Sequence, residues 1–152
     1  MDALIAALSR LIVRGHPSQL GIALEKRRRL ADLIRWYIDQ FYVIVQWQRS
    51  KQNALRFLER HEIGTEDVHQ LSISKLVQHV RSRRAENAGP ATAQSDLVYI
   101  GVVLAGAQAV GSCPVDPDIA VAARDTCRRL HLIGEPNRAF CHTDIPCVCS
   151  DA

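Results

Sequence analysis

The chain has 152 residues, of which 47% are hydrophobic and 23% are charged, so it is long and apolar enough to form one globular core. A formal net charge of +3 at pH 7 is too small to indicate a nucleic-acid-binding protein by itself. The N-terminal apolar run follows an acidic residue, Asp2, instead of the positive charge of a secretory signal, and we expect a soluble, intracellular protein.

The first predicted helix runs from Asp2 to about Arg14. Asp2 is a suitable N-terminal cap, and leucine and isoleucine residues recur at the spacing that places them on one helical face. Gly15 can end this helix, because glycine readily adopts the backbone conformation that follows a helix C-terminus.

An apolar, aromatic-rich stretch, residues 30–49, reads LADLIRWYIDQFYVIVQWQR and contains both tryptophans. We assign it to a second helix that begins near Ser18 and either runs to about Arg60 or bends near Gly21. Apolar side chains lie on several sides of this helix, so other protein is expected to surround it. Two interpretations stay open, since either helices of the same chain or partner chains can cover it.

A third helix is expected from Thr65 to about Arg84. Thr65 can cap it, acidic residues follow in its first turn, and arginines lie near its end, which suits the helix dipole. Residues 85–94 contain a Gly-Pro pair and only one charged residue, and this composition predicts a linker.

A fourth helix is expected to begin at Ser95 and to continue through Leu104, although its β-branched residues also permit a strand. Asp118 can cap a fifth helix that ends near Leu132. The sequence therefore predicts an all-α bundle of about five helices with a long, central, aromatic-rich helix. We expect a helical domain over residues 1–132, with the linker near 85–95, and an irregular cysteine-bearing tail over residues 133–152.

The chain contains no phosphate-binding glycine loop, hydrolase nucleophile motif, zinc-protease motif or calcium-binding loop. Its closest approach to a di-iron motif is one Glu-x-x-His pair, Glu66 and His69, whereas a di-iron bundle needs such a pair on two helices. We therefore expect a protein without enzymatic activity, small-molecule substrate or cofactor. Its apolar stretches are too short to predict a membrane span.

All five cysteines lie in the last third of the chain, and an odd number argues against a disulfide framework. The candidate metal ligands are Cys127, His131, Cys147 and Cys149, because the first two are one helical turn apart and the others lie in the tail. The tail residues lack the spacing of two to four residues that zinc sites usually show. We favour reduced thiols without metal and keep a zinc-bearing adaptor as an alternative.

A basic cluster, Lys-Arg-Arg-Arg, occupies residues 26–29. Such a cluster can bind phosphates without sequence preference, so a small helical nucleic-acid-binding protein is a second alternative. No aromatic residue is interleaved with the cluster for base stacking. We favour a solvated face that also offers salt bridges to a partner protein.

Part of the sequence resembles a known family. Arg28-Arg29-Leu30, followed by Ile34, Phe41 and residues 43–47, VIVQW, is similar to the N-terminal region of the large scaffold subunit, subunit fourteen, of the Mediator transcription complex. The first predicted helix and residues 96–106 resemble flanking parts of that region, so the similarity extends over about residues 1–114. Members of that family are far longer chains, and the cysteine tail has no counterpart in the resemblance.

The resemblance implies an architectural function in the nucleus, as a scaffold segment of a transcription coactivator complex that packs against other helical subunits. On this interpretation Phe41, Val45 and Trp47 are apolar anchors at the partner interface. Arg27, Arg28 and Arg29 are the polar partner contacts. Direct nucleic-acid binding, a membrane and a small-molecule substrate have no part in such a function.

Overall fold

The computed structural model describes residues 29–41, 49–110 and 116–134, and these residues form an all-α structure without β-strands. The elements in chain order are α3 (Leu30–Phe41), α4 (Arg49–Arg60), the short 3-10 helices η1 (Glu62–Thr65) and η2 (Val68–Gln70), α5 (Ile73–Ala85), α6 (Pro90–Ala109) and α7 (Asp118–Arg129). The predicted fold class is therefore confirmed for the described part of the chain. The first predicted helix and the cysteine tail lie outside it.

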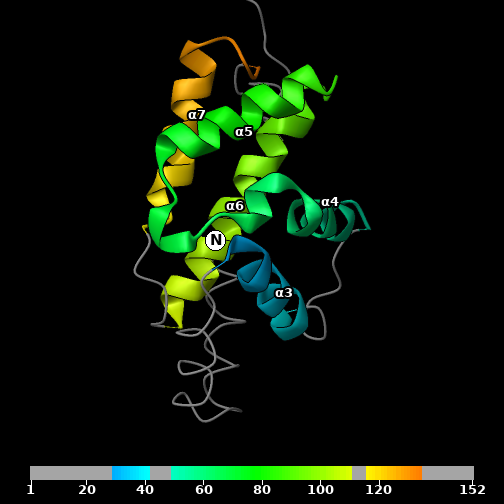
Figure 1. Cartoon of the computed structure of the whole chain (residues 1–152), viewed down its shortest axis with the longest axis vertical. Helices are drawn as coiled ribbons and strands as arrows, with labels where there is room; N and C mark the ends of the chain where they lie inside the picture. Colours follow the sequence, from blue (N-terminus) through cyan, green and yellow to red (C-terminus); the bar gives the residue numbers. More distant parts are fainter. Residues whose placement is uncertain (1–28, 42–48, 111–115, 135–152) are drawn as a thin grey trace, which may run out of the picture.

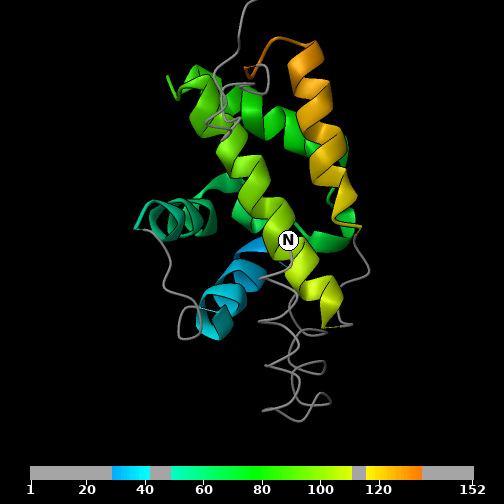
Figure 2. The same ribbon diagram turned by 180° about the vertical axis from the view of Figure 1, so that it is seen from behind.

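Helix α6 is the centre of the bundle and contacts α3, α4, α5 and α7 (Figures 1 and 2). It has one charged residue, Asp96, and is apolar on all sides, which is typical of a helix surrounded by protein. Its buried apolar residues are Ala93, Leu97, Ile100, Val103, Leu104 and Ala107. The organising helix of the fold is thus α6, whereas the sequence analysis placed the aromatic-rich helix at the centre.

The predicted linker is shorter than expected, because α6 begins at Pro90 instead of Ser95. Proline suits the first turn of a helix, where its missing N–H would have no partner in any case. The Gly-Pro pair therefore starts a helix here, and the prediction of a linker through Gln94 is wrong. Only residues 86–89 connect α5 with α6.

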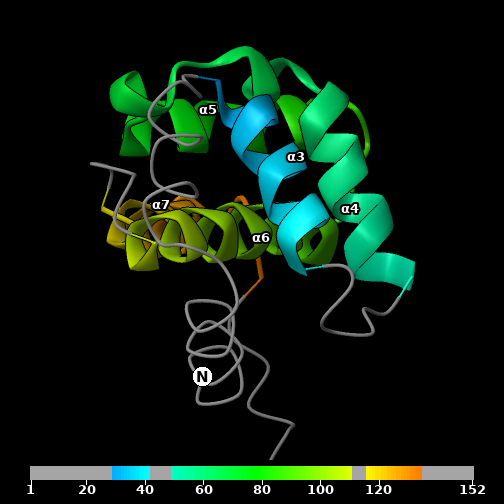
Figure 3. The ribbon, with the colours of Figure 1, turned by 90° about the horizontal axis from the view of Figure 1, so that it is seen from below.

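The aromatic-rich helix is shorter than predicted, because α3 ends at Phe41 and α4 begins at Arg49. The two helices lie side by side (Figure 3). Arg35 Nη2 donates a hydrogen bond of 2.8 Å to Glu59 Oε1, whereas one continuous helix would hold these residues about 36 Å apart. The prediction of a single helix reaching Arg60 is therefore wrong, and the segment forms a helical hairpin.

The aromatic side chains of α3 lie in the core of their own chain. Trp36, Tyr37 and Phe41 are each no more than 2% exposed. The rings of Tyr37 and Phe41 stack with centroids 4.5 Å apart, and Trp36 meets Phe41 edge to face at 6.1 Å. Burial raises the pKa of Tyr37 to about 12. Phe41 is therefore covered within the chain, which corrects its expected place at a partner interface, while Val45 and Trp47 lie outside the described residues.

Close packing of α3 against α6 depends on Gly106. A Cβ atom at this position would lie 3.2 Å from two carbon atoms of the Tyr37 ring. The absence of a side chain lets the aromatic stack rest directly on the backbone of α6. This contact seats the α3–α4 hairpin on the central helix.

The connection from α4 to α5 runs through η1 and η2 and differs from the predicted third helix. Thr65 caps no long helix, because it lies at the end of η1 and its hydroxyl donates to the Glu62 carbonyl oxygen at 2.7 Å. Ser72 caps α5 instead, by accepting a hydrogen bond from the Lys75 N–H. The prediction of a helix from Thr65 is therefore correct only from Ile73 onward.

We expect Gly64→Ala to lower the free energy of unfolding by about 1–3 kcal/mol, the usual cost of overpacking a filled site. A Cβ atom on Gly64 would lie 2.7 Å and 2.8 Å from the carbonyl oxygens of Glu59 and Leu58, which are backbone atoms of α4. Gly89→Ala is the matched control, because nothing lies within 4 Å of its added Cβ atom. Chemical denaturation measures both, and equal stability of the two variants would contradict the packing at Gly64.

Helix α7 packs on α5 and α6 with small residues. Ala120, Ala123 and Cys127 are buried, and a Cβ atom added at Gly101 would meet the Ala120 Cβ atom at 3.1 Å, which shows how closely α6 and α7 approach. Within the described ranges, none of the helices combines the length and the apolar composition that crossing a bilayer requires.

Candidate functional site

Helix α4 has two opposite faces, one buried and one basic. Leu55 and Leu58 are fully buried in the core. Arg49, Asn53, Arg56 and Arg60 are all exposed, and their spacing of four, three and four residues places them in one row on a helix. We call these four residues the arginine stripe. A helix that buries leucines on one side and presents three arginines on the other has a natural binding surface for anions.

The three guanidinium groups of the stripe have no acidic partner among the residues that the structure describes. The only acidic residue of α4, Glu59, lies off the stripe and binds Arg35 of α3. The hydrogen bond to Glu59 raises the pKa of Arg35. Among the described residues, no carboxylate therefore neutralises the positive charge of the stripe.

A hollow of about 450 Å³ lies at the C-terminal end of the stripe, and we call it the α4 pocket. It is lined by Asn53, Arg56, Phe57, Arg60 and His61. No carboxylate contributes to this lining. Its volume falls within the range of about 300–1,000 Å³ that is usual for small-ligand sites.

The Phe57 side chain in the α4 pocket is held in place from α5. The Arg83 guanidinium lies over the Phe57 ring, with its carbon 4.0 Å from the ring centroid, and such cation–π contacts are favourable. The His61 ring lies 5.2 Å from the Phe57 ring on the same helix end. Phe57 is 37% exposed, so part of the ring stays open to the pocket while Arg83 covers one face.

Arg83 also belongs to a polar network that fixes the end of α4 relative to α5 and α6. Its Nε donates to Asp96 Oδ2 and its Nη1 donates to Glu86 Oε2, both at 2.9 Å. The backbone N–H of Ile63 donates a hydrogen bond to His61 Nδ1, so the ring proton lies on Nε2. His61 Nε2 donates this proton to Glu86 Oε1, at a distance of 3.2 Å between the two atoms. The α4 pocket is therefore built on a rigid support.

The charges of this network favour their ionised forms. Burial lowers the pKa of Arg83, but the hydrogen bonds to Asp96 and Glu86 outweigh it and the net direction is upward. The hydrogen bonds from Arg83 and His61 hold the pKa of Glu86 below its usual value. Because the pKa of Glu86 is lower in the folded chain than in the unfolded chain, ionised Glu86 stabilises the fold at any pH above its unfolded pKa. This stabilisation is lost as the pH falls through the folded pKa.

His79 is the buried end of the same network. It is 4% exposed and Asp96 is 2% exposed. His79 Nε2 lies 3.4 Å from Asp96 Oδ2, within ion-pair distance, but the alignment is unsuitable for a hydrogen bond. Its ring meets the His61 ring at a centroid distance of 4.9 Å in a T-shaped arrangement. His61 and His79 thus join α4 to α5 through ring packing.

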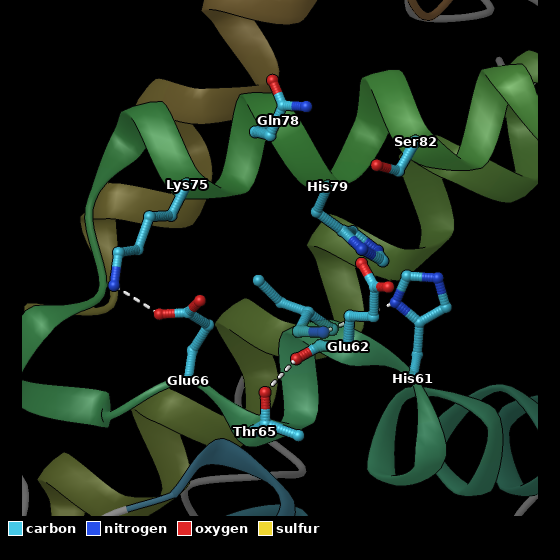
Figure 4. A pocket seen from close by; sticks show the side chains of 9 residues that line it. His61, Glu62, Thr65, Glu66, Lys75, Gln78, His79 and Ser82 are labelled. Atoms are coloured by element: carbon cyan, nitrogen blue, oxygen red, sulfur yellow. Dashed lines mark hydrogen bonds and ion pairs between the residues drawn. The ribbon is translucent and has the colours of Figure 1, made fainter.

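A second hollow, of about 350 Å³, lies on the other side of His61 (Figure 4). Glu66 and Lys75 point toward each other across it and form an ion pair, while His61 and His79 lie at its other end. His79 lines this hollow, but both of its ring nitrogens are covered by protein. Glu66 and Lys75 neutralise each other, and Glu62 adds a second carboxylate to the lining, so this hollow is a weaker candidate for an anionic ligand than the α4 pocket.

The described residues also do not form a metal site. No group of three or more histidine, cysteine or acidic side chains in the described ranges is arranged to hold a metal ion. Cys127 is buried in the core, where burial raises the pKa of its thiol, and His131 is exposed beyond the end of α7. The structure therefore separates these two candidates by environment, while Cys147 and Cys149 lie outside the described residues.

The predicted basic contacts are described only at Arg29. Its side chain is exposed, and its backbone forms an isolated antiparallel bridge with Asp67. Arg27 and Arg28 lie outside the described residues, so the predicted role of the three arginines stays a prediction. The sequence analysis missed the arginine stripe, although the regular spacing of Arg49, Asn53, Arg56 and Arg60 opposite two leucines was a signal for it.

Comparison of the chain with models of known families, with curated proteins and with solved structures found no match.

Proposed function

We propose that this protein is a non-catalytic interaction module that binds an acidic segment of a partner protein along the arginine stripe of α4. The observation that carries this proposal is the row of three exposed arginines without acidic partners among the described residues. Opposite charges across an interface speed association and select the partner. An acidic protein segment supplies the complementary charge.

The dimensions of the stripe suit a partner helix. From Arg49 to Arg60 the helix rises about 16 Å, or three turns. A second helix with acidic residues at the same spacing of four, three and four would place a carboxylate opposite each guanidinium. Phe57, next to the stripe and partly exposed, offers an apolar contact of the kind that interface centres favour. The partner is therefore an amphipathic acidic helix.

The resemblance to the Mediator scaffold subunit gives a more specific form of this proposal. In that form the bundle is a scaffold segment in the nucleus, and the acidic helix belongs to another subunit of a transcription coactivator complex. From the sequence, we expected a partner to bind apolar residues of α3, but these residues are buried within the chain. Helix α3 therefore has no large apolar surface left for a partner. Charge on α4, more than apolar surface on α3, would hold the neighbouring subunit.

A nucleic acid is the second candidate for a basic surface, and the contacts of Phe57 favour the protein partner. Single-stranded nucleic acids are commonly bound by aromatic rings that stack on bases. Arg83 covers one face of the Phe57 ring, so only the other face could stack on a base, and among the described residues no tryptophan or tyrosine lines the α4 pocket beside it. The arginines alone would give salt-sensitive binding without sequence preference.

The test reverses the charge of the stripe with the variant R49E/R56E/R60E. The probe is a synthetic acidic helical peptide with glutamates at the spacing of the stripe, and its binding is measured by calorimetry. We expect about a 100-fold loss of affinity, since attraction becomes repulsion at three contacts. The matched control R81E/R84E/R129E makes the same change in net charge at exposed positions on α5 and α7 and should bind as the unchanged protein does.

Equal losses in the two triple variants would show that only net charge matters and would contradict a defined stripe. A DNA or RNA duplex that binds more tightly than the acidic peptide at the same salt concentration would favour the nucleic-acid function instead. Circular dichroism of both variants checks that the helical fold is retained.

A further inference from the structure

We propose that the α4 pocket holds a phosphorylated side chain of the acidic partner, so that phosphorylation of the partner controls its binding. This inference rests on the proposed function, because the phosphorylated residue belongs to the segment that lies along the arginine stripe. It adds a site, the α4 pocket, and a ligand class, the phosphate monoester.

The lining of the α4 pocket fits a doubly charged anion. Arg56 and Arg60 are four residues apart on one helical face, so both guanidinium groups can reach a single ligand in the pocket they line. A carboxylate would neutralise only one of them. A phosphate monoester carries a charge of about −1.5 to −2 at pH 7 and offers three acceptor oxygens, which suits two planar guanidinium groups that each bind in a bidentate manner.

The remaining lining residues agree with this ligand. The amide of Asn53 can donate a further hydrogen bond. His61 has both ring nitrogens engaged, with the Ile63 N–H and with Glu86, so its ring serves as a wall of the pocket beside Phe57. The neighbouring hollow has Glu62 and Glu66 in its lining, and these carboxylates would repel a phosphate. The α4 pocket is therefore the hollow suited to the anion.

The rest of the stripe is separate from this pocket. Arg49 does not line it and lies two helical turns, about 10 Å, before Arg56. Arg49 is thus available for an ordinary carboxylate of the partner while Arg56 and Arg60 bind the phosphate. A variant at Arg56 and Arg60 therefore tests the phosphate site, and a variant at Arg49 serves as its matched control.

The experiment uses the full chain and three labelled versions of one acidic helical peptide, measured by fluorescence polarisation. They carry phosphoserine, serine or glutamate at the position that faces the α4 pocket. We expect the phosphoserine peptide to bind about tenfold more tightly than the glutamate peptide at pH 7.5. We expect this preference to fall at pH 5, because the phosphate loses one charge below its second pKa of about 6.

The variant R56K/R60K separates geometry from charge. Lysine keeps the positive charge but lacks the planar fork that binds an oxyanion with two hydrogen bonds. We expect this variant to lose most of its preference for phosphoserine over glutamate, with a smaller loss of affinity for the glutamate peptide. R49K is the control, and its preference for phosphoserine should stay unchanged.

The outcomes distinguish this inference from the proposed function. Equal binding of the phosphoserine and glutamate peptides would overturn the phosphate site and leave the acidic partner standing. Failure of all three peptides to bind would overturn both. Displacement of the phosphoserine peptide by inorganic phosphate at the peptide's own dissociation constant would show a site for the free anion and would also overturn the inference.

Discussion

Phe41→Ala is expected to lower the free energy of unfolding by about 3–5 kcal/mol, the usual cost of deleting a large aromatic side chain from a core. Phe41 is 1% exposed, and its ring stacks on the Tyr37 ring. Both rings lie where α3 packs closely on α6 at Gly106. Its removal leaves a cavity where α3 meets α6. Urea denaturation followed by circular dichroism measures the loss, and Phe41→Leu supplies a milder variant if the alanine variant fails to fold.

Val121→Ala is the control for this measurement, because Val121 is 44% exposed on α7. Surface substitutions of this kind usually change stability by less than about 0.5 kcal/mol. If Phe41→Ala were as stable as Val121→Ala and instead lost a protein partner, Phe41 would be an interface residue. The account of α3 as part of the chain's own core would then be wrong.

Asp96→Ala is expected to destabilise the fold by about 3–5 kcal/mol, because removal of the buried member of this ion pair leaves Arg83 with only the exposed carboxylate of Glu86. The Asp96 side chain is 3% exposed and lies within ion-pair distance of both Arg83 and His79. Thermal and urea denaturation measure the loss. The α4 pocket should also loosen, since Arg83 then loses the buried one of the two carboxylates that hold it over Phe57.

Glu86→Ala removes the other carboxylate that binds Arg83, and it provides a matched comparison. Glu86 is exposed at the end of α5, where water screens an ion pair and its contribution to stability is small. We expect a much smaller loss than for Asp96→Ala. Losses of similar size in both variants would show that Asp96 has no special role as the buried anchor of the network.

The sequence was sufficient to predict the helical class and the buried stripe of α3. Apolar residues that recur every three or four positions indicate a helix through local geometry alone. It was insufficient to show that α3 and α4 are two separate helices that lie side by side. Residues 30–60 contain no proline or glycine to mark a helix end, so a continuous helix was the natural prediction. The contact of Arg35 with Glu59, which shows the hairpin, is a tertiary contact without a local signal.

The start of α6 and the cap of α5 were misjudged for a different reason. A Gly-Pro pair indicates either a loop or a helix start, and the choice depended on whether the apolar residues after Pro90 would find a core. Thr65 and Ser72 are both acceptable caps, and the burial of Ile63 and Val68 in η1 and η2 favours the later one. Local propensity left both choices open, and packing decided them.

The arginine stripe was visible in the sequence as a spacing, but its significance depends on the fold. Arginines on one face of a helix are often solvated or paired with acidic neighbours. The structure shows that Glu59 is occupied by Arg35 and that the buried leucines fix the stripe toward the surface. The α4 pocket depends on Arg83 from α5 as well, which no pattern within α4 could indicate.

The most direct test of the account is an NMR titration of the isotope-labelled chain with the acidic helical peptide. We predict that the amide signals that shift belong to residues 49–61, with the largest changes at Arg56, Phe57 and Arg60, and that signals of α3 and α7 stay in place. Shifts concentrated in α3, or spread evenly over every basic residue, would contradict the claim that a self-supporting bundle binds its partner through one face of α4.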